Sequence, residues 1–380
     1  MKSIQKILSI FLLTVGVVGV FSSCKKDDAP GVPSISYVRV TNPQSSDSLL
    51  VAAGQGQLIA IVGENLQDAT EIWFNDQQSL LTPTYITNKT ILVRVPTQIP
   101  LAVNNTMKIV FKNGNVLNHN FQVQISKPII TGIVSEFVND GDVATIFGNY
   151  FYAPVTVIFP GGVNGQIISH TATQIDVTVP AGAQPGQLIV KTNFGEGKSD
   201  FLFRDPRPKL ITGDDPPLGW WPTYLVTNPG PNDPPKISGN YYRFKKQVKD
   251  WNWDAPEVAG GPASAYSTSK NIPDAAILKP EDYFVKFEVN TMKPYNANRI
   301  SFNVGLTAED NDAYVWAPPF DTKGKWVTVS IPFEDMVRSY KTKPVISPSG
   351  YWTRILIFGP GDFDADISFD NLRVVPKKAQ

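Results

Sequence analysis

Two stretches of equal length, 58-LIAIVGENLQDATEIWF-74 and 143-VATIFGNYFYAPVTVIF-159, determine the fold that we expect for this chain. In each stretch, apolar residues alternate with other residues on both sides of a glycine, which predicts half-buried strands separated by turns. The two glycines, Gly63 and Gly148, are 85 residues apart, and Pro96 and Pro180 repeat at an offset of 84. The sequence therefore predicts an internal repeat of β-rich units.

Short motifs within the repeat resemble the IPT/TIG family of immunoglobulin-like domains. The second copy opens with Pro128 and Ile130 and continues with 142-DVATIFGN-149, which is similar to the family's glycine-containing strand. The resemblance covers residues 33–204 and implies two small β-sandwiches in tandem. It implies little about function, because one fold hosts many functions and domains of this family often serve as spacers.

The chain begins with a segment that is typical of a secretory signal peptide. Lys2 and Lys6 precede an apolar run at residues 7–21, and two small serines follow. The alternative is a membrane-spanning helix, but about 15 apolar residues are fewer than the roughly 20 that a span needs. We therefore expect residues 1–23 to be removed.

Cys24 is the only cysteine, so no disulfide can form within the chain. The stretch 21-FSSC-24 resembles the lipobox of bacterial lipoproteins, which implies that Cys24 is lipidated. The following 25-KKDD-28 resembles the export signal of Bacteroidetes surface lipoproteins. These resemblances imply an anchor in the outer membrane and a location on the cell surface.

The composition excludes several classes of function. Lys plus Arg and Asp plus Glu both number 34, so the net charge is zero and there is no basic footprint for nucleic acid. No glycine-rich phosphate-binding motif is present. The two histidines, His119 and His170, fall one in each repeat and are expected to be ordinary polar residues. No cofactor is predicted.

The composition changes after residue 204. Nine prolines lie between Pro206 and Pro235, and seven of the eight tryptophans follow Asp205. Alternating segments such as 283-YFVKFEVNT-291 predict antiparallel strands in a jelly-roll-like sandwich. The predicted fold class is all-β, with two tandem immunoglobulin-like sandwiches followed by this third sandwich. The expected domains are 1–23 (signal peptide), 24–32 (tether), 33–126 and 127–204 (IPT/TIG-like), and 205–380 (C-terminal sandwich).

The order of these parts resembles the surface glycan-binding protein B family of Bacteroidetes polysaccharide utilisation loci. The resemblance is carried by the lipobox, the IPT-like repeats, the proline-rich break and a tryptophan-rich sandwich that contains 313-AYVWAPP-319. It implies a non-catalytic surface lipoprotein that binds xyloglucan or another β-glucan, and not an enzyme. The partners that it implies are the polysaccharide and a TonB-dependent transporter with its SusD-like protein.

Aromatic rings in the last domain are the candidate glycan platforms, because a flat ring covers the apolar face of a pyranose. Trp316 is the first candidate, since prolines and acidic neighbours indicate an open loop. Tyr351 and Trp352 are expected at the rim of a strand. Trp251 and Trp253 would share one face if 250-DWNWDAP-256 were extended. For every one of these rings, packing in the sandwich is the alternative.

Polar partners for sugar hydroxyls are predicted from strand parity. Arg354 shares the strand face of Trp352, and Asn303 lies opposite the apolar face of its own strand. Either residue can equally be ordinary surface. Trp326 is expected to be structural, and Trp220 and Trp221 either bind ligand or fix the domain junction.

Two other functions remain open from the residues alone. A glycosidase needs only two carboxylates at a suitable separation, although a Ser-His-Asp esterase is excluded because residues 205–380 contain no histidine. A protein-binding adhesin is the other alternative. The run 362-DFDADISFD-370 starts like a calcium loop, but Ile367 replaces the required glycine, so an EF-hand is rejected and no metal ligand is assigned, while a structural calcium site of another type stays an alternative.

Overall fold

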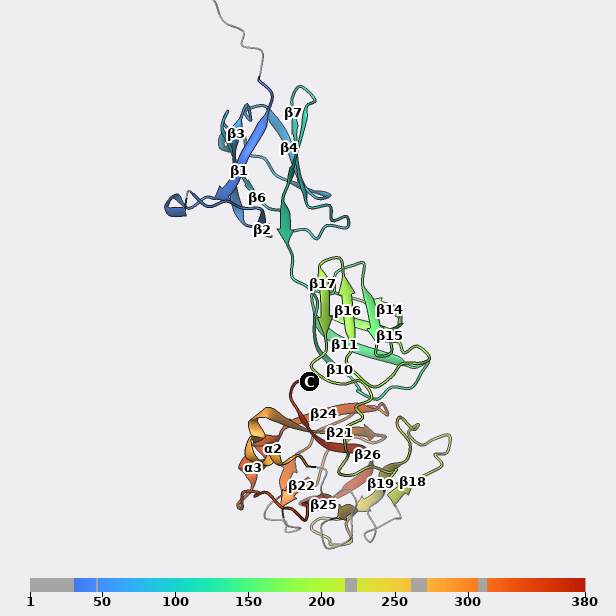
Figure 1. Cartoon of the computed structure of the whole chain (residues 1–380). Coiled ribbons are helices and arrows are strands. Elements are labelled where there is room, and N and C mark those ends of the chain that lie inside the picture. The colour runs from blue at the N-terminus through green and yellow to red at the C-terminus, as the bar shows by residue number, and fades with distance from the viewer. Residues whose placement is uncertain (1–30, 46, 216–223, 261–271, 307–312, 380) are drawn as a thin grey trace, which may run out of the picture. The chain divides into compact units, whose positions relative to one another are not determined.

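A computed structural model of the chain describes residues 31–45, 47–215, 224–260, 272–306 and 313–379 (Figure 1). The signal peptide, Cys24 and the pair Trp220–Trp221 lie outside these described residues. The chain divides into two compact units, residues 1–125 and residues 126–380. Among the described residues, no helix is long and apolar enough to cross a membrane.

The first unit is a small β-sandwich. Its main sheets have the strand orders β1-β3-β6 and β5-β4-β7-β8, and β2 pairs with β9 in parallel. Buried aliphatic and aromatic side chains fill one core, among them Ile61 and Ile72 from the two sheets and Phe121 from the link between β8 and β9. The strands are β1 (Ser34–Val40), β2 (Ala52–Gly54), β3 (Leu58–Glu64), β4 (Ala69–Phe74), β5 (Gln77–Ser79), β6 (Thr90–Arg94), β7 (Thr106–Phe111), β8 (Val116–Asn120) and β9 (Gln122–Gln124).

The second unit begins with a sandwich of the same design. Its sheets have the orders β10-β11-β15-β14 and β13-β12-β16-β17, which match those of the first domain strand for strand except at one edge. The strands are β10 (Ile129–Ile133), β11 (Val143–Asn149), β12 (Thr156–Phe159), β13 (Val163–Asn164), β14 (Gln166–His170), β15 (Gln174–Thr178), β16 (Ile189–Thr192) and β17 (Gly195–Lys198). The predicted repeat of immunoglobulin-like sandwiches is confirmed.

The repeated glycines explain why the two copies share a local sequence. A Cβ at Gly63 would lie 1.9 Å from the carbonyl oxygen of Ser34, and a Cβ at Gly148 would lie 2.1 Å from that of Ile129. In both domains the first strand shifts its register at this point, between Ile35 and Tyr37 and between Ile130 and Gly132. Only glycine allows the two backbones to approach so closely.

The C-terminal sandwich contains a five-stranded sheet and a four-stranded sheet (Figure 1). The five-stranded sheet has the order β18-β19-β26-β21-β24, and the four-stranded sheet has the order β20-β25-β22-β23. The strands are β18 (Leu225–Val226), β19 (Tyr241–Val248), β20 (Glu257–Gly260), β21 (Tyr283–Thr291), β22 (Ile300–Leu306), β23 (Tyr314–Trp316), β24 (Val327–Pro332), β25 (Trp352–Ile357) and β26 (Phe363–Pro376), with short helices α2 (Asp274–Leu278) and α3 (Phe333–Ser339).

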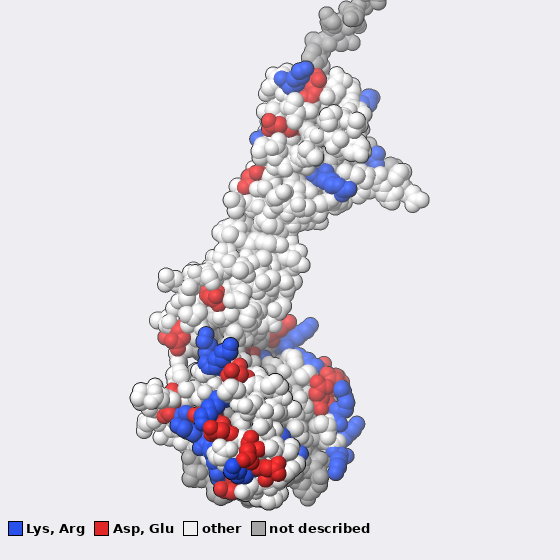
Figure 2. Space-filling view, turned by 180° about the vertical axis from the view of Figure 1, so that it is seen from behind, with Lys and Arg blue, Asp and Glu red and all other residues white. Residues whose placement is uncertain are grey.

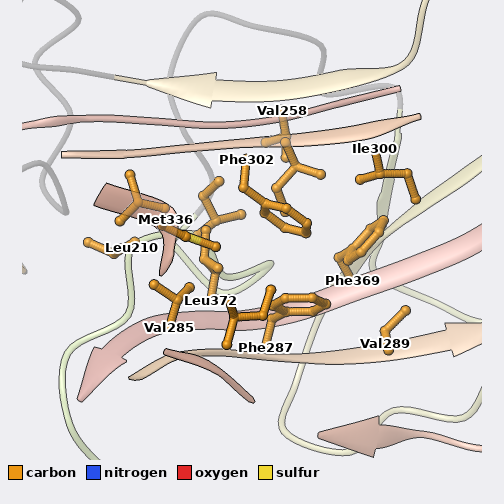
Figure 3. Packing of buried hydrophobic residues seen from close by; sticks show 14 of the residues in the cluster. Leu210, Val258, Val285, Phe287, Val289, Ile300, Phe302, Met336, Phe369 and Leu372 are labelled. Atoms are coloured by element: carbon orange, nitrogen blue, oxygen red, sulfur yellow. The ribbon is translucent and has the colours of Figure 1, made fainter. Parts of the chain in front are cut away.

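The core of this sandwich lies between its two sheets. Figure 3 shows Val258 and Phe302 from the four-stranded sheet above Phe287 and Phe369 from the five-stranded sheet. The rings of Phe287 and Phe302 stack with centroids 4.8 Å apart. Successive side chains of a strand point to opposite faces of its sheet. Because these residues point into the core, their neighbours along each strand lie on the outer faces of the two sheets.

The outer face of the five-stranded sheet is polar but buried, and it meets the second immunoglobulin-like domain. Arg373, which is fully buried, places its guanidinium 2.6 Å from Glu136 and 2.8 Å from Glu288, and its Nε atom lies 3.3 Å from Asp205. Lys286 forms a further ion pair with Glu136. Because Glu136 belongs to the immunoglobulin-like domain, this network joins the two sandwiches into one unit.

Backbone contacts extend the same junction along strand β24. The amide of Thr328 donates to the carbonyl of Val134 at 2.9 Å, and the Thr328 hydroxyl accepts from the amide of Glu136 at 2.7 Å. An edge strand of one sandwich is therefore capped by the chain of the other, which removes exposed hydrogen-bonding groups from both.

Candidate functional site

The outer face of the four-stranded sheet brings together three of the predicted site residues. Along β25, Trp352 and Arg354 alternate with the core residue Ile355 and its neighbours. Asn303 of β22 lies directly opposite Arg354. Strand periodicity puts all three residues on the side of the sheet that faces away from the core, as the sequence predicted. Asn303 is nevertheless fully buried there, so its side chain is not open to a ligand in this structure.

An ion pair forms the polar centre of this face. Arg354 donates through Nε and Nη2 to one carboxylate oxygen of Glu257, both at 2.7 Å, and both side chains are about nine-tenths buried. Glu257 lies in β20, next to β25 in the sheet. Sequence reasoning missed Glu257, because 97 residues separate it from Arg354 and no local pattern connects them.

Beyond one end of β25, two tryptophans gather on Phe358. The ring of Trp253 stacks on the buried ring of Phe358, with centroids 4.1 Å apart and planes inclined by 21°. Trp251 meets the same ring edge-on at 5.2 Å. Trp253 is nevertheless 67% exposed and Trp251 48% exposed. One face of the Trp253 indole is thus supported by protein, and the other face is open to solvent.

The loop that carries these rings is held in place at several points. The Trp251 amide donates to the carbonyl of Gly359 at 2.9 Å, and the Asp250 carboxylate accepts from the amide of Gly361 at 2.6 Å. The guanidinium of Arg299 lies 5.0 Å from the centre of the Trp251 ring, which is a cation–π distance. The platform is therefore ordered before any ligand arrives, which lowers the entropic cost of binding.

Trp251 adopts a backbone conformation that is unusual for a bulky residue. Its φ angle is +47°, in the left-handed region that disfavours residues with a Cβ. The loop is therefore not extended, although the prediction for 250-DWNWDAP-256 assumed that it was. Strained positions of this kind persist only where surrounding contacts fix them, and they concentrate at functional sites.

The platform and the polar centre lie along the same strand. From Trp352 to Phe358 the chain advances six residues, or about 20 Å at the rise of a β-strand. Over that distance the chain presents an aromatic side chain, an Arg–Glu pair and then the Phe358–Trp253 stack. Rings for the apolar faces of sugars and charged groups for their hydroxyls are the two elements that a saccharide site needs.

The structure corrects the expected environment of Trp316. It lies in strand β23 and not in an open loop, and register places it opposite the core residue Ile300. Its half-buried ring contacts Phe320 at 4.7 Å and Phe287 at 5.5 Å between centroids. The prolines that indicated a loop follow the strand directly, and the indole packs against the edge of the core. Its contact with a ligand stays a prediction.

Tyr351 is also not at a rim. It is only 4% exposed, belongs to the core cluster, and donates its hydroxyl hydrogen to Asp274 at 3.1 Å. The turn before β25 directs this ring inward, so it is unavailable as a platform in this structure. The structural role expected for Trp326 is confirmed, because its ring is 7% exposed and its indole nitrogen donates to Pro235.

The carboxyl groups whose pKa is raised, Glu288 and Asp370, lie away from this face. Burial raises the pKa of Asp370 to about 7, and hydrogen bonds from Ser238 and Asn371 only partly oppose that shift. Asp370 is 1% exposed, so a polymer has no access to its carboxyl group. Within the described part of the chain, no group of three or more His, Cys, Asp or Glu residues could hold a metal ion.

The charged residues of the C-terminal sandwich are mixed in sign. Figure 2 shows Lys and Arg side chains interspersed with Asp and Glu over the visible face of this domain, whereas the immunoglobulin-like domains show few charges there. A mixed surface of this kind does not select a ligand by its net charge. A neutral ligand such as an uncharged polysaccharide is compatible with it.

The fold and this face define a multidomain all-β protein in which immunoglobulin-like sandwiches precede a larger sandwich with exposed indoles. Residues 203–376 match the family described as the surface glycan-binding protein B (SGBP-B) xyloglucan binding domain, and residues 45–125 match the IPT/TIG domain. The C-terminal sandwich is therefore similar to the glycan-binding domain of SGBP-B proteins, and the first sandwich is similar to an IPT/TIG domain.

The relatives agree with this assignment. An IPT/TIG domain-containing protein of Bacteroides ovatus is 28% identical over 233 residues, which are 55% of this chain and 47% of the relative. The match thus spans about half the length of that relative. The crystal structure of the surface glycan-binding protein PbSGBP-B from Prevotella bryantii has 22% identity and a TM-score of 0.67, with 92% of this chain and 99% of that chain covered.

A second solved structure shares the fold. It is an SGBP-B from a complex xyloglucan utilization locus in Bacteroides uniformis, with 17% identity and a TM-score of 0.50. The match covers 91% of this chain and 100% of that chain. The three-sandwich architecture of the described residues is therefore shared with known surface glycan-binding proteins.

Proposed function

We propose that this chain is a non-catalytic, surface-exposed lipoprotein that binds a plant-type polysaccharide through its C-terminal sandwich. The observation that carries the proposal is the Trp253 ring, which is stacked on Phe358 and yet 67% exposed. An apolar ring held open to water on a fixed loop is explained by a ligand better than by packing. The family match supports a glycan as that ligand.

Xyloglucan, or another β-glucan, is the proposed polysaccharide. The support is the description of the matched family and the utilisation locus of the B. uniformis relative. A β-linked glucan has flat, apolar sugar faces that suit the open indole, and equatorial hydroxyls that suit a polar centre such as Arg354 and Glu257. Mixed-linkage glucan shares these features, and mannan shares them except for its axial 2-hydroxyl, so both are the alternatives that the experiment must separate.

Lipidation at Cys24 would hold the protein on the outer membrane, where a TonB-dependent transporter and its SusD-like partner would receive the polymer. The support for the anchor is the lipobox-like 21-FSSC-24 and the surface location of the related proteins. A weak site suffices in this setting, because many copies on one membrane meet one long polymer.

A hydrolase is the less favoured alternative. The described carboxyl groups with raised pKa, such as Asp370, are buried behind the five-stranded sheet and not on the aromatic face. A protein-binding adhesin would use the immunoglobulin-like domains and does not explain the fixed, exposed indoles. Release of reducing ends from the polymer would establish the hydrolase.

Affinity electrophoresis of residues 33–380 in gels that contain xyloglucan, mixed-linkage glucan or mannan tests the proposal. We expect xyloglucan or mixed-linkage glucan to retard the protein. If stacking on Trp253 buries roughly 50–100 Å² of apolar surface, Trp253→Ala should weaken binding about 5- to 70-fold. The matched control is Tyr85→Ala, which removes a ring that is 52% exposed in the first unit. Equal retardation of wild type and Trp253→Ala would contradict the assigned platform.

A further inference from the structure

A second group of aromatic rings, one exposed and two half-buried, lies at the surface of the other sandwich of the same unit. Tyr150 and Tyr152 follow strand β11, and their ring centroids are 6.1 Å apart. Phe194, in the turn between β16 and β17, meets Tyr152 edge-on, also at 6.1 Å. Tyr150 is 36% exposed, and the other two rings are half-buried. We call these three residues the Tyr150 patch.

The core of the sandwich does not require the rings of the Tyr150 patch. The residue between the two tyrosines, Phe151, is 1% exposed and belongs to the core. Its amide donates to the carbonyl of Ala172, which fixes the chain at this point. The rings on either side are left at the surface. The packing of the domain therefore accounts for Phe151 but not for the tyrosines.

Tyr150 has a backbone conformation that is unusual for a tyrosine. Its φ angle is +62°, in the left-handed region that glycine and asparagine occupy readily and that a tyrosine disfavours. Glycine would satisfy the local conformation with less strain. Of the described non-glycine residues with positive φ, the two aromatic ones are Tyr150 and Trp251, and each belongs to an exposed aromatic group. Asn65, at the equivalent position of the first repeat, has a φ of +57°, so the turn requires this conformation in both copies, and it is the tyrosine in place of asparagine that packing does not explain.

The surroundings of the Tyr150 patch suit an uncharged ligand. The nearest charged groups on the β16–β17 hairpin, Lys191 and Glu196, neutralise each other in an exposed ion pair at 3.2 Å. Asn149, which is exposed, precedes Tyr150 and provides an amide that can donate to and accept from hydroxyls. Aromatic rings beside an amide form the same chemical combination as a saccharide platform, and the cation of Lys127, which lies against Gly195, can donate to a hydroxyl.

We infer that the Tyr150 patch is a second contact site for the polysaccharide that the C-terminal sandwich binds. The inference rests on the proposed function and adds a site to it. The buried Arg373–Glu136 network fixes both sandwiches in one unit, so a long polymer held at one site stays at high local concentration near the other. Without deep walls, the patch alone would bind too weakly to be detected with a short oligosaccharide.

The test compares long and short ligands on the chain 33–380. Tyr150→Gly is the decisive variant, because glycine suits the backbone and the melting temperature should not fall. We expect its affinity for the long polymer, from retardation in gels, to drop about three- to tenfold. Its calorimetric affinity for a short oligosaccharide of the same glycan should remain that of the wild type. The matched control is Ile168→Ala, an exposed apolar residue, 58% accessible, in the same domain.

Three results would overturn the inference. Unchanged retardation of Tyr150→Gly would show that the patch does not touch the polymer. An equal loss of polymer and oligosaccharide affinity would show that the variant disturbs the main site. If no polymer retards the wild-type chain, both the proposed function and the second site are wrong. This outcome is seen in the wild type, whereas the first two are seen only in the variant. A variant that pairs Phe194→Ala with Tyr150→Gly should lower polymer affinity further.

Discussion

Arg373 shows how one residue can couple two domains. Its guanidinium contacts carboxylates from three separate parts of the chain, and neither it nor Glu288 is exposed to water. A buried charge without a partner is very unfavourable, so these groups stabilise the fold only as a complete set. The sequence shows Arg373 merely as a polar position on the last strand.

We expect Arg373→Met to lower the free energy of unfolding by about 3–5 kcal/mol, because the buried Glu288 would lose its cationic partner and Glu136 would keep only Lys286. Urea denaturation followed by fluorescence would measure the change. Arg338→Ala is the control, since Arg338 is 71% exposed and its surface ion pairs contribute at most about 1 kcal/mol. A loss below 1 kcal/mol for Arg373→Met would mean that the network is not coupled as the geometry indicates.

Asp370 gives a prediction about pH. Burial raises its pKa to about 7 in the folded protein, against about 4 in an unfolded chain. The folded state therefore holds a proton that the unfolded state releases over this range. The contribution of Asp370 to the free energy of unfolding is fully present below about pH 4. It falls by up to about 1.4 kcal/mol per pH unit as the pH rises toward 7.

Asp370→Asn should remove this dependence, because an amide does not titrate. The measurement is the difference in unfolding free energy between wild type and variant at several pH values from 4 to 8. The difference cancels other groups, such as Asp205, whose pKa is lowered and whose effect has the opposite sign. A constant difference across the whole range would show that Asp370 titrates normally in the folded protein.

At the scale of elements, strand β23 and the Trp253 loop give their tryptophans different roles. Trp316→Ala removes a half-buried ring that packs on Phe287 and Phe320, and we expect a loss of roughly 2–4 kcal/mol of stability. Trp253→Ala removes an exposed ring and should cost less than about 1 kcal/mol of stability while weakening glycan binding. Thermal unfolding of the two variants in parallel separates the roles. Equal destabilisation would argue that Trp253 is part of the packing.

Strand periodicity predicted most elements of the C-terminal sandwich. The segment 283–291 is strand β21 with the expected bounds, and the shared face of Trp352 and Arg354 is confirmed by register. What periodicity could not show is which polar face is covered. Lys286 and Glu288 alternate with apolar residues like any solvated strand face, yet both are buried, because the second immunoglobulin-like domain packs over them with Glu136, which lies 150 residues before Lys286.

The errors at the site have related causes. Trp316 precedes two prolines, which locally indicate a turn, but its neighbours across the sheet place it against the core. Tyr351 precedes β25 by one residue, and only the path of the turn decides whether its ring faces inward. Glu257 could not be found at all, since pairing across a sheet between distant segments is set by the tertiary fold.

At the scale of the whole molecule, the last two sandwiches have separate cores but belong to one compact unit. Composition placed a domain boundary near residue 205, and this boundary stays a prediction. The compact units are 1–125 and 126–380. Leu210 and Ile211, which follow Asp205, belong to the core of the C-terminal sandwich.

We expect a fragment of residues 205–380 to be less stable than a fragment that includes the second immunoglobulin-like domain. Truncation before residue 205 removes Glu136, which forms ion pairs with both Lys286 and Arg373. The longer fragment 126–380 keeps the network. If the cut costs about 3–5 kcal/mol, the melting temperature should fall by more than about 6 °C, as measured by calorimetry on both fragments. Equal melting temperatures would show that the junction contributes nothing to the sandwich.

The ionic junction also constrains the ancestry of the chain. Modular proteins evolve by recombination, which is best tolerated where the exchanged domain leaves no unpaired buried groups in its neighbour. Here a crossover between the last two sandwiches would bring Arg373 beside a foreign partner that has no carboxylate at the right place. The two sandwiches should therefore pass together from gene to gene, while the first immunoglobulin-like unit is free to be duplicated, exchanged or lost.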